Sequence, residues 1–220
     1  AGLSISEKMR NQIRGINQSV DNAEDGISLI QTAEGNLNEM HSILQRMGEL
    51  ATKAANDVNE TEDRSTISDE IGQLNTELNS IATKAKYNGK SLSSFSGYLQ
   101  VGANSGDNMH ISVAVTVTVA TTTVDTHANA STTITSVTNA IKSVSSQRSK
   151  LGAVQNRLEY TVNSLQNYSE NLTTSESRIR DTDMASEMVS YSKNNILQQA
   201  AQSMLTQANQ SNQGVLSLLQ

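Results

Sequence analysis

The chain has 220 residues, a formal net charge of −6 and no proline, cysteine or tryptophan. Hydrophobic residues make up 35% of the chain and aromatic residues 3%, which argues against a thick globular core and an apolar, ligand-burying enzyme pocket. The lack of cysteine excludes disulfides, thiol catalysis and cysteine-bound zinc, and the acidic balance opposes general nucleic-acid binding. Because proline costs about 3 kcal/mol inside a helix, its absence favours long uninterrupted helices.

A seven-residue repeat of apolar residues predicts a first long helix over about residues 3–56. One series runs without a break through Met9, Ile16, Ala23, Ile30, Leu37, Leu44 and Ala51. A second series lies between its members and consists of Ile13, Val20 and Ile27. Together they form the a/d seam of a coiled-coil-like helix. Glu34, His41 and Gly48 occupy the next positions of the second series, so we expect the seam to narrow where the helix changes neighbours or meets solvent.

A second, shorter helix is predicted over about residues 62–86. The polar stretch 56–65 before it indicates a turn, and Thr61 or Ser65 is placed to cap the helix. Its apolar residues alternate at spacings of four and three: Ile67, Ile71, Leu74, Leu78, Ile81 and Ala85. Because a short loop favours antiparallel neighbours, we expect this helix to fold back on the first.

The apolar period changes to two after the second helix. Asn88-Gly89 is a turn signal, and the valines from Val113 to Val119 alternate with Ala and Thr. We therefore predict a hairpin over about residues 97–119 with a long, half-buried second strand. Such a strand needs a partner, from this chain or another, because an open strand edge promotes aggregation. Residues 120–133 are small and polar, which indicates a loop or linker.

The heptad repeat returns in a third helix over about residues 131–181. Its unbroken series is as long as the first: Val137, Val144, Leu151, Leu158, Leu165, Leu172 and Ile179. We expect the two long helices to run side by side with the shorter one packed against them. From Asp183 onward an almost uncharged helix carries small and flexible apolar residues: Leu197, Ala200, Ala201, Met204, Leu205 and Ala208. Alone, such a helix is marginal in water, so we expect its burial against another chain.

The sequence holds no group of residues typical of an enzyme. The histidines at 41, 110 and 127 lack the spacing of zinc ligands, and no phosphate-binding loop or nucleophile motif occurs. Asp181 and Asp183 form a carboxylate pair without a base partner. We therefore predict no catalytic residue, no metal and no cofactor, and we interpret His41 as a partly exposed structural histidine.

The end of the third helix is charged and has two interpretations. Arg178, Arg180 and Asp181 either form solvated surface charge, which contributes little to stability, or dock a second subunit through Arg–carboxylate pairs. No apolar run approaches the roughly 20 residues of a membrane span, and the first residues lack the order of a secretory signal peptide. The chain is therefore cytosolic, leaves the cell by another route, or lacks its true N-terminus.

Both ends of the chain resemble the bacterial flagellin family. The N-terminal conserved region of that family is similar to residues 1–15, 25–50 and 87–90, and its C-terminal conserved region is similar to residues 145–167, 170–188, 194–210 and 214–220. The matches occur in the family's order and cover most of the chain. Within the superfamily the hook–filament junction protein is the nearest relative, but ESRIRDTDMA and QANQ favour flagellin.

The resemblance implies a mainly α fold, in which an elongated bundle of long antiparallel coiled-coil-like helices carries a small β-hairpin capping one end. Residues 1–182 would form the rod-like inner-tube domain, with 120–133 as a residual hypervariable linker, and 183–220 the C-terminal helix segment lining the filament core. In the family the N- and C-terminal helices pair and polymerise into the filament used for swimming. The family also has a further helix before Ala1, so we expect a shortened, mainly monomeric chain.

The resemblance also implies extracellular placement after export by the flagellar type III apparatus, and it implies a set of partners. These are other flagellin subunits, an export chaperone on the C-terminal segment, the filament cap and the hook–filament junction proteins. Residues expected to serve assembly are Arg178, Arg180, Asp181, Leu197, Ala201, Met204, Leu205, Leu218 and Leu219.

The family's patch for Toll-like receptor five maps onto Gln45, Arg46, Glu49, Leu50 and Lys53. Here Gly48 stands where members often carry Arg, and Lys53 where many carry Gln. Glycine inside a helix costs about 1 kcal/mol relative to alanine and removes a possible charged contact. A ligand of this receptor, another helical adaptor module and the hook–filament junction protein remain the alternatives to a filament subunit.

Overall fold

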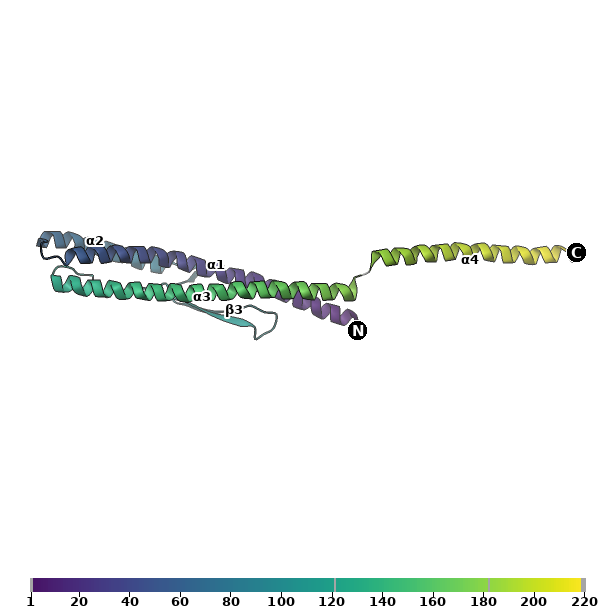
Figure 1. Ribbon diagram of the computed structural model, residues 1–220, viewed down its shortest axis with the longest axis horizontal. Helices are drawn as coiled ribbons and strands as arrows, with labels where there is room; N and C mark the ends of the chain where they lie inside the picture. The colour runs from purple at the N-terminus through teal and green to yellow at the C-terminus, as the bar shows by residue number, and fades with distance from the viewer. Residues whose placement is uncertain (1, 121, 182, 219–220) are drawn as a thin grey trace. The chain divides into compact units, whose positions relative to one another are not determined.

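The computed structural model describes residues 2–120, 122–181 and 183–218, with the backbone alone for 211–218. Within these residues the helices are α1 (Gly2–Ala54), α2 (Thr61–Lys84), α3 (His127–Arg180) and α4 (Met184–Leu218). Two antiparallel hairpins lie between α2 and α3, formed by β1 (Lys86–Tyr87) with β2 (Lys90–Ser91) and by β3 (Phe95–Gln100) with β4 (Asn108–Val113). The predicted mainly α fold of long helices is confirmed (Figure 1).

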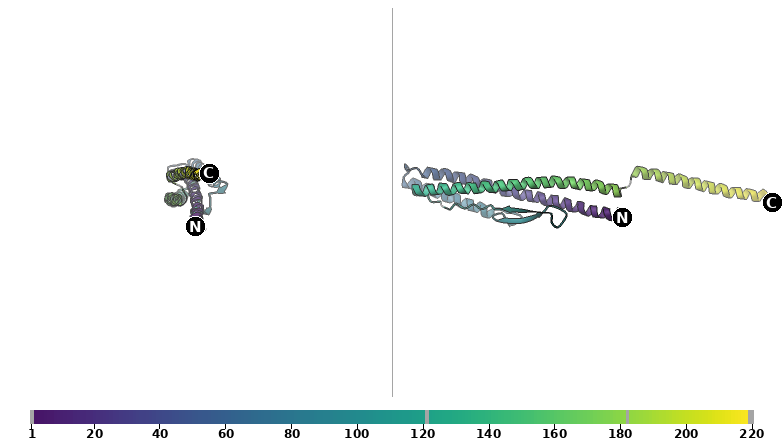
Figure 2. Two further views of the ribbon diagram at one scale, coloured as in Figure 1. Left: turned by 90° about the vertical axis from the view of Figure 1, so that its right-hand side faces the viewer. Right: turned by 60° about the horizontal axis from the view of Figure 1, so that its bottom comes forward.

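The chain divides into two compact units. One comprises residues 8–173, and in it α1, α2 and α3 run alongside one another with the hairpins against them (Figures 1 and 2). The other comprises residues 1–7 and 174–220. In that unit the buried Ser6 hydroxyl donates a hydrogen bond of 2.7 Å to Glu176 Oε1, which ties the first turns of α1 to the last turns of α3.

The two heptad series form the core of the 8–173 unit. On α1 every member from Ile16 to Ala51 is buried, and on α3 so is every member from Val137 to Leu158. Burial then declines along α3, where Leu165 and Leu172 are half-buried. The paired lines of branched and unbranched apolar side chains therefore hold the two long helices together, as the repeat predicted.

Polar contacts between α1 and α3 show that these helices are antiparallel. Ser169 Oγ donates to Asn17 Oδ1 at 2.9 Å, Arg148 Nη2 pairs with Glu34 Oε1 at 3.5 Å, and His127 Nδ1 lies 2.7 Å from the carbonyl oxygen of Ala55. As the position on α1 rises, the position on α3 falls. The register is constant between the pairs Glu34/Arg148 and Ala55/His127 and differs by four residues at Asn17/Ser169.

The second apolar series on α1 ends after Ile27 and the helix changes neighbours there, as expected, but the buried seam does not narrow. A new line of fully buried residues begins there and consists of Ala33, Met40, Met47 and Ala54. Glu34, His41 and Gly48 are only half-buried. The new line lies on the other flank of the main series, where α2 contributes Ile67, Ile71 and Leu78 to the same core. The helix therefore gains a second neighbour at this point.

α2 is capped by a residue other than the two we expected. Its N-cap is Glu60, whose backbone N–H donates to Asp63 Oδ2 at 3.2 Å in a capping box. Thr61 and Ser65 lie inside the helix. Negative side chains are stabilised near the positive, N-terminal end of a helix dipole. The carboxylates of Glu60 and Asp63 are therefore more favourable at this end than the hydroxyl of Thr61 or Ser65.

The larger hairpin is shorter than predicted and lies alongside α1 and α3 instead of across an end of the bundle. β4 ends at Val113, opposite Phe95, because β3 offers no residue beyond that pair. The alternation nevertheless continues, with Val115, Val117 and Val119 buried, and the Val115 N–H donates to Leu92 O at 3.0 Å. Residues 114–119 therefore pack on the core outside the two hairpins, joined to residues 92 and 93 by hydrogen bonds from Val115 and Thr116.

The predicted linker 120–133 is partly helical, since α3 begins at His127. Ala130 and Thr133 are fully buried, and Thr133 Oγ1 donates to the carbonyl of Thr123 at 2.9 Å. The small polar side chains of this stretch carry no apolar period, so its sequence resembles a loop. Packing against the end of α1, through His127, makes it helical.

Candidate functional site

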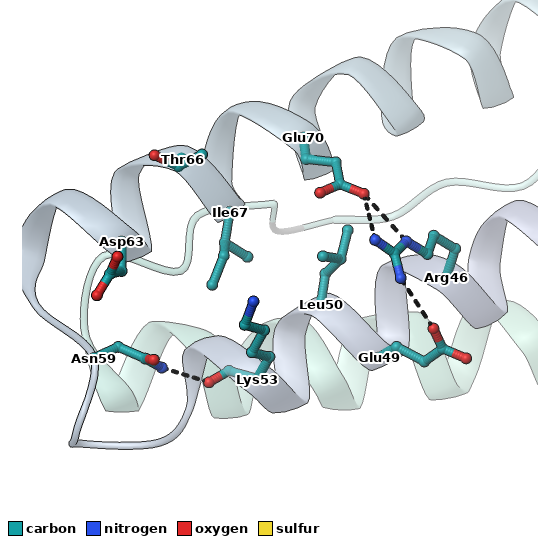
Figure 3. A pocket seen from close by; sticks show the side chains of 9 residues that line it. All are labelled: Arg46, Glu49, Leu50, Lys53, Asn59, Asp63, Thr66, Ile67 and Glu70. Carbon is teal, nitrogen blue, oxygen red and sulfur yellow. Dashed lines mark hydrogen bonds and ion pairs between the residues drawn. The ribbon is translucent and has the colours of Figure 1, made fainter.

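A shallow pocket lies between α1 and α2, near the loop that joins them (Figure 3). Its volume is about 500 Å³, and its lining consists of Arg46, Glu49, Leu50, Lys53, Asn59, Asp63, Thr66, Ile67 and Glu70. The Leu50 and Ile67 side chains point toward each other across its floor and are nearly buried. Charged and polar groups from both helices surround this apolar floor, an arrangement suited to a protein partner with an apolar anchor.

Arg46 connects the two helices at the rim of the pocket. Its Nε and Nη2 atoms donate to Glu70 Oε1 at 3.1 and 2.9 Å, and Nη1 donates to Glu49 Oε2 at 3.3 Å. Hydrogen bonding and charge attraction from Glu70, and then from Glu49, raise the pKa of Arg46 above its ordinary value. The exposed ion pairs contribute little to stability, but they fix the direction of the guanidinium.

The structure brings together four of the five residues expected to contact a receptor. Arg46, Glu49, Leu50 and Lys53 line the pocket, whereas Gln45 is exposed outside it. Sequence reasoning missed the α2 side of the pocket, formed by Asp63, Thr66, Ile67 and Glu70. Their spacing of three, four and seven residues places them along one side of α2, which is the signal that could have revealed them.

A side chain at position 48 would begin on the side of α1 that faces α3. A Cβ atom at Gly48 would meet Val137 Cγ1 of α3 at 3.6 Å, an ordinary contact distance. A longer side chain here would therefore extend toward α3.

α4 carries a second candidate surface. Eight large apolar side chains on it are 55–71% exposed: Met184, Met188, Val189, Tyr191, Ile196, Leu197, Met204 and Leu205. Met184 and Met188 share one face of the helix, whereas Val189 and Ile196 share another. A helix that is apolar on several sides is typical of one that becomes buried by several neighbours, and exposed apolar area of this kind marks an interaction site.

The predicted assembly residues on the C-terminal segment fall into two groups. Leu197, Ala201, Met204 and Leu205 lie exposed on α4. The side chain of Leu218 and the whole of Leu219 lie outside the described residues.

The charged residues at the end of α3 are exposed, and some of them stabilise the ends of α3 and α4. Arg178 and Arg180 occupy the last turn of α3, where positive charge is favourable. Ser177 Oγ donates to Asp181 Oδ2 at 2.6 Å, and Asp183 Oδ1 accepts from the Ala185 and Ser186 N–H groups at 3.0 and 3.2 Å. Asp181 is therefore bonded to the last turn of α3, and Asp183 to the first turn of α4.

The histidines lie at separate structural positions. His110 Nε2 is 3.0 Å from Ser96 Oγ, and its ring lies edge-on to Tyr98 on the exposed face of the hairpin. His127 Nδ1 is hydrogen-bonded to the carbonyl oxygen of Ala55, directly after α1. Across residues 2–120, 122–181 and 183–218, no group of three or more His, Asp or Glu side chains is placed to hold a metal ion. No helix in those ranges is long and apolar enough to span a membrane.

Two family models match the chain. Residues 1–99 match the bacterial flagellin N-terminal helical region, and residues 134–219 match the bacterial flagellin C-terminal helical region. The chain belongs to the bacterial flagellin family. Flagellins are structural subunits of the flagellar filament, so the chain is a structural protein and not an enzyme.

Similar proteins include flagellins of several bacteria. The chain is 49% identical to a flagellin of Halalkalibacterium halodurans, covering 100% of this chain and 84% of the relative. It is 44% identical to a flagellin of Bacillus subtilis, covering 100% and 86%. The crystal structure of Bacillus cereus flagellin superposes with a TM-score of 0.61 at 28% identity, covering 78% of this chain and 94% of that one. The fold expected from the flagellin resemblance is thereby supported.

Proposed function

We propose that this flagellin self-assembles into an extracellular filament through α4, with residues 183–220 as the filament-core segment. The observation that carries the proposal is the exposure of eight large apolar side chains on α4, in a chain whose 8–173 unit already has its own core. Burying apolar surface is favourable by roughly 25 cal/mol per Å². Neighbouring copies would supply that burial on several sides of the helix.

The remaining partners are those that the resemblance to flagellins implies. An export chaperone would cover α4 until the subunit leaves through the flagellar type III apparatus, since uncovered apolar helices aggregate. The filament cap and the hook–filament junction proteins would meet the subunit at the two ends of the filament. Arg178, Arg180 and Asp181 would add charged contacts beside the apolar ones.

Filament formation is tested in a motile bacterium whose own flagellin genes are deleted. The complete coding sequence, as the only flagellin gene, is expected to restore filaments in electron micrographs and swimming in soft agar. The double substitution Leu197→Asp and Met204→Asp is expected to abolish both. Val58→Asp is the matched control, because Val58 is 81% exposed but lies in the loop before α2. Normal filaments from the double variant would overturn the role of α4, and none from the unaltered gene would favour the junction-protein alternative.

We also propose that the pocket at Arg46 binds Toll-like receptor five. Support comes from the guanidinium that Glu70 and Glu49 hold in place beside an apolar floor, since arginine and apolar anchors dominate protein interfaces. Arg46→Ala is expected to lower the affinity for the receptor ectodomain roughly tenfold, the size typical of an interface anchor. Lys150→Ala, exposed on α3, is the control and should leave affinity unchanged. Equal affinity of Arg46→Ala and the unaltered chain would exclude this pocket.

A further inference from the structure

Six of the seven methionines of this chain occupy two contrasting environments, and the seventh, Met9, is half-buried on α1. Met40 and Met47 are fully buried between α1 and its neighbours, and Met109 is 9% exposed. On α4, Met184, Met188 and Met204 are 66%, 64% and 71% exposed. Thioether side chains thus contribute to the exposed apolar surface both at the start of α4 and in the later stretch around Leu205.

We propose that Met184, Met188 and Met204 form a redox-sensitive modification site, at which peroxide-class oxidants convert the thioethers to sulfoxides and thereby block assembly through α4. The effect on assembly rests on the proposed function, in which these side chains become buried against other subunits. The selectivity of the oxidation does not, because it follows from the exposure of the side chains in the single chain. The protein has no cysteine, so methionine sulfur is its readily oxidised group.

The reaction is an oxygen-atom transfer. The thioether sulfur attacks the O–O bond of hydrogen peroxide, that bond breaks, and one oxygen atom becomes bonded to sulfur. The other oxygen leaves as water with both peroxide protons. Sulfur loses two electrons and the peroxide gains two. The product is a polar, chiral sulfoxide in place of a flexible apolar side chain.

The position of the three methionines explains why sulfoxide formation would matter for assembly. Met184 and Met188 lie one turn apart on the same face of α4, and Met204 lies one position before Leu205 in the second apolar stretch. Burial of a polar group without a hydrogen-bond partner is unfavourable. An apolar subunit interface that accepts a thioether would therefore reject the sulfoxide at both places along the helix.

Site selectivity is measured by peptide mass spectrometry after brief treatment of the soluble chain with hydrogen peroxide. Tryptic peptide 181–193 carries Met184 and Met188, and peptide 194–220 carries Met204, whereas 15–46 and 47–53 carry the buried Met40 and Met47. The α4 peptides are expected to oxidise at least about tenfold faster than the buried controls, because susceptibility follows exposure. Equal rates in the two groups would overturn the proposed site.

The assembly effect is measured with subunits released from filaments, oxidised, and returned to assembly conditions. Oxidised subunits are expected to lose most of their polymer yield, and treatment with both methionine sulfoxide reductases should restore it. The variant Met184→Leu, Met188→Leu and Met204→Leu should resist the oxidant, whereas Met40→Leu with Met47→Leu should remain sensitive. Normal assembly of oxidised subunits, or equal sensitivity of the two variants, would overturn the inference. Failure of untreated subunits to assemble would instead contradict the proposed function.

Discussion

α1 and α4 are both long helices without proline, yet the leucines of α1 from Leu29 to Leu50 are buried and those described on α4 are exposed. Leu37 and Leu44 on α1 are fully buried, whereas Leu197 and Leu205 on α4 are 55% and 66% exposed. On α1 the apolar residues follow heptad lines that face α3 and α2, while on α4 they occupy several sides of the helix. A heptad line thus specifies a neighbour within the chain, and an all-round apolar helix specifies neighbours outside it.

The largest expected effect on folding is the loss of a core leucine from α1. Leu44→Ala should lower the free energy of unfolding by about 2–5 kcal/mol, because it leaves a cavity in a close-packed interior. Leu197→Ala, the same change on α4, should lower it by no more than about 0.5 kcal/mol. Urea unfolding of the soluble chain, followed by circular dichroism, measures both values. Similar losses for the two substitutions would mean that α4 packs within the single chain.

A smaller effect on stability is expected when either of two glycines on α1 is replaced by alanine. A Cβ atom at Gly26 would overlap Leu99 Cδ1 of the hairpin and lie 3.4 Å from Leu158 Cδ1, whereas one at Gly35 meets nothing within 4 Å. Gly35→Ala should therefore stabilise the chain by up to about 1 kcal/mol through helix propensity. In Gly26→Ala the same gain is opposed by the steric cost of overpacking, which destabilises the chain by about 1–3 kcal/mol.

Thermal unfolding of the two glycine variants separates these contributions. Gly26→Ala should melt below Gly35→Ala, and amide exchange should be faster in β3 and β4 of the Gly26 variant only. Equal melting temperatures would show that the hairpin does not depend on a close approach at Gly26.

The smallest effect concerns the pH dependence at the start of α3. The side-chain amide of Asn129 donates to Asp125 Oδ1 at 2.7 Å and lowers the pKa of that carboxyl below its ordinary value. A lowered folded pKa means that this contribution to stability is present above the ordinary pKa. It is lost as the pH falls through the folded value. An NMR titration should show Asn129→Ala returning the Asp125 midpoint toward the ordinary value, and an unchanged midpoint would contradict this cause.

The repeat lines on α1 and α3 are visible in the sequence because apolar residues at a fixed period of seven are typical of a helix that buries one face. The line through Ala33, Met40, Met47 and Ala54 has the same period of seven, and its burial follows from the packing of α2. Two features are not visible in the sequence, since each depends on a neighbour distant in sequence. β4 stops at Val113 because β3 ends opposite it. The small residues from His127 to Thr133 are helical because they pack on the end of α1.

The candidate sites are predictable to different degrees for the same reason. The apolar residues of α4 lie close together in sequence and need no partner within the chain to be noticed. Half of the pocket at Arg46 comes from α2, whereas the family resemblance implied residues of α1 alone. The sequence position of Gly48, between Arg46 and Glu49, suggests that it faces this pocket, but a Cβ atom added there would meet Val137 of α3.

Hydrogen–deuterium exchange on the free subunit and on assembled filaments tests most directly whether α4 finds its burial in other copies. Amides of α1 from Ile30 to Ala51 should be protected in both states, because their core is complete within the chain. Amides of α4 from Met188 to Leu205 should exchange rapidly in the free subunit and become protected in the filament. Strong protection of α4 in the free subunit, or none in the filament, would contradict this assignment.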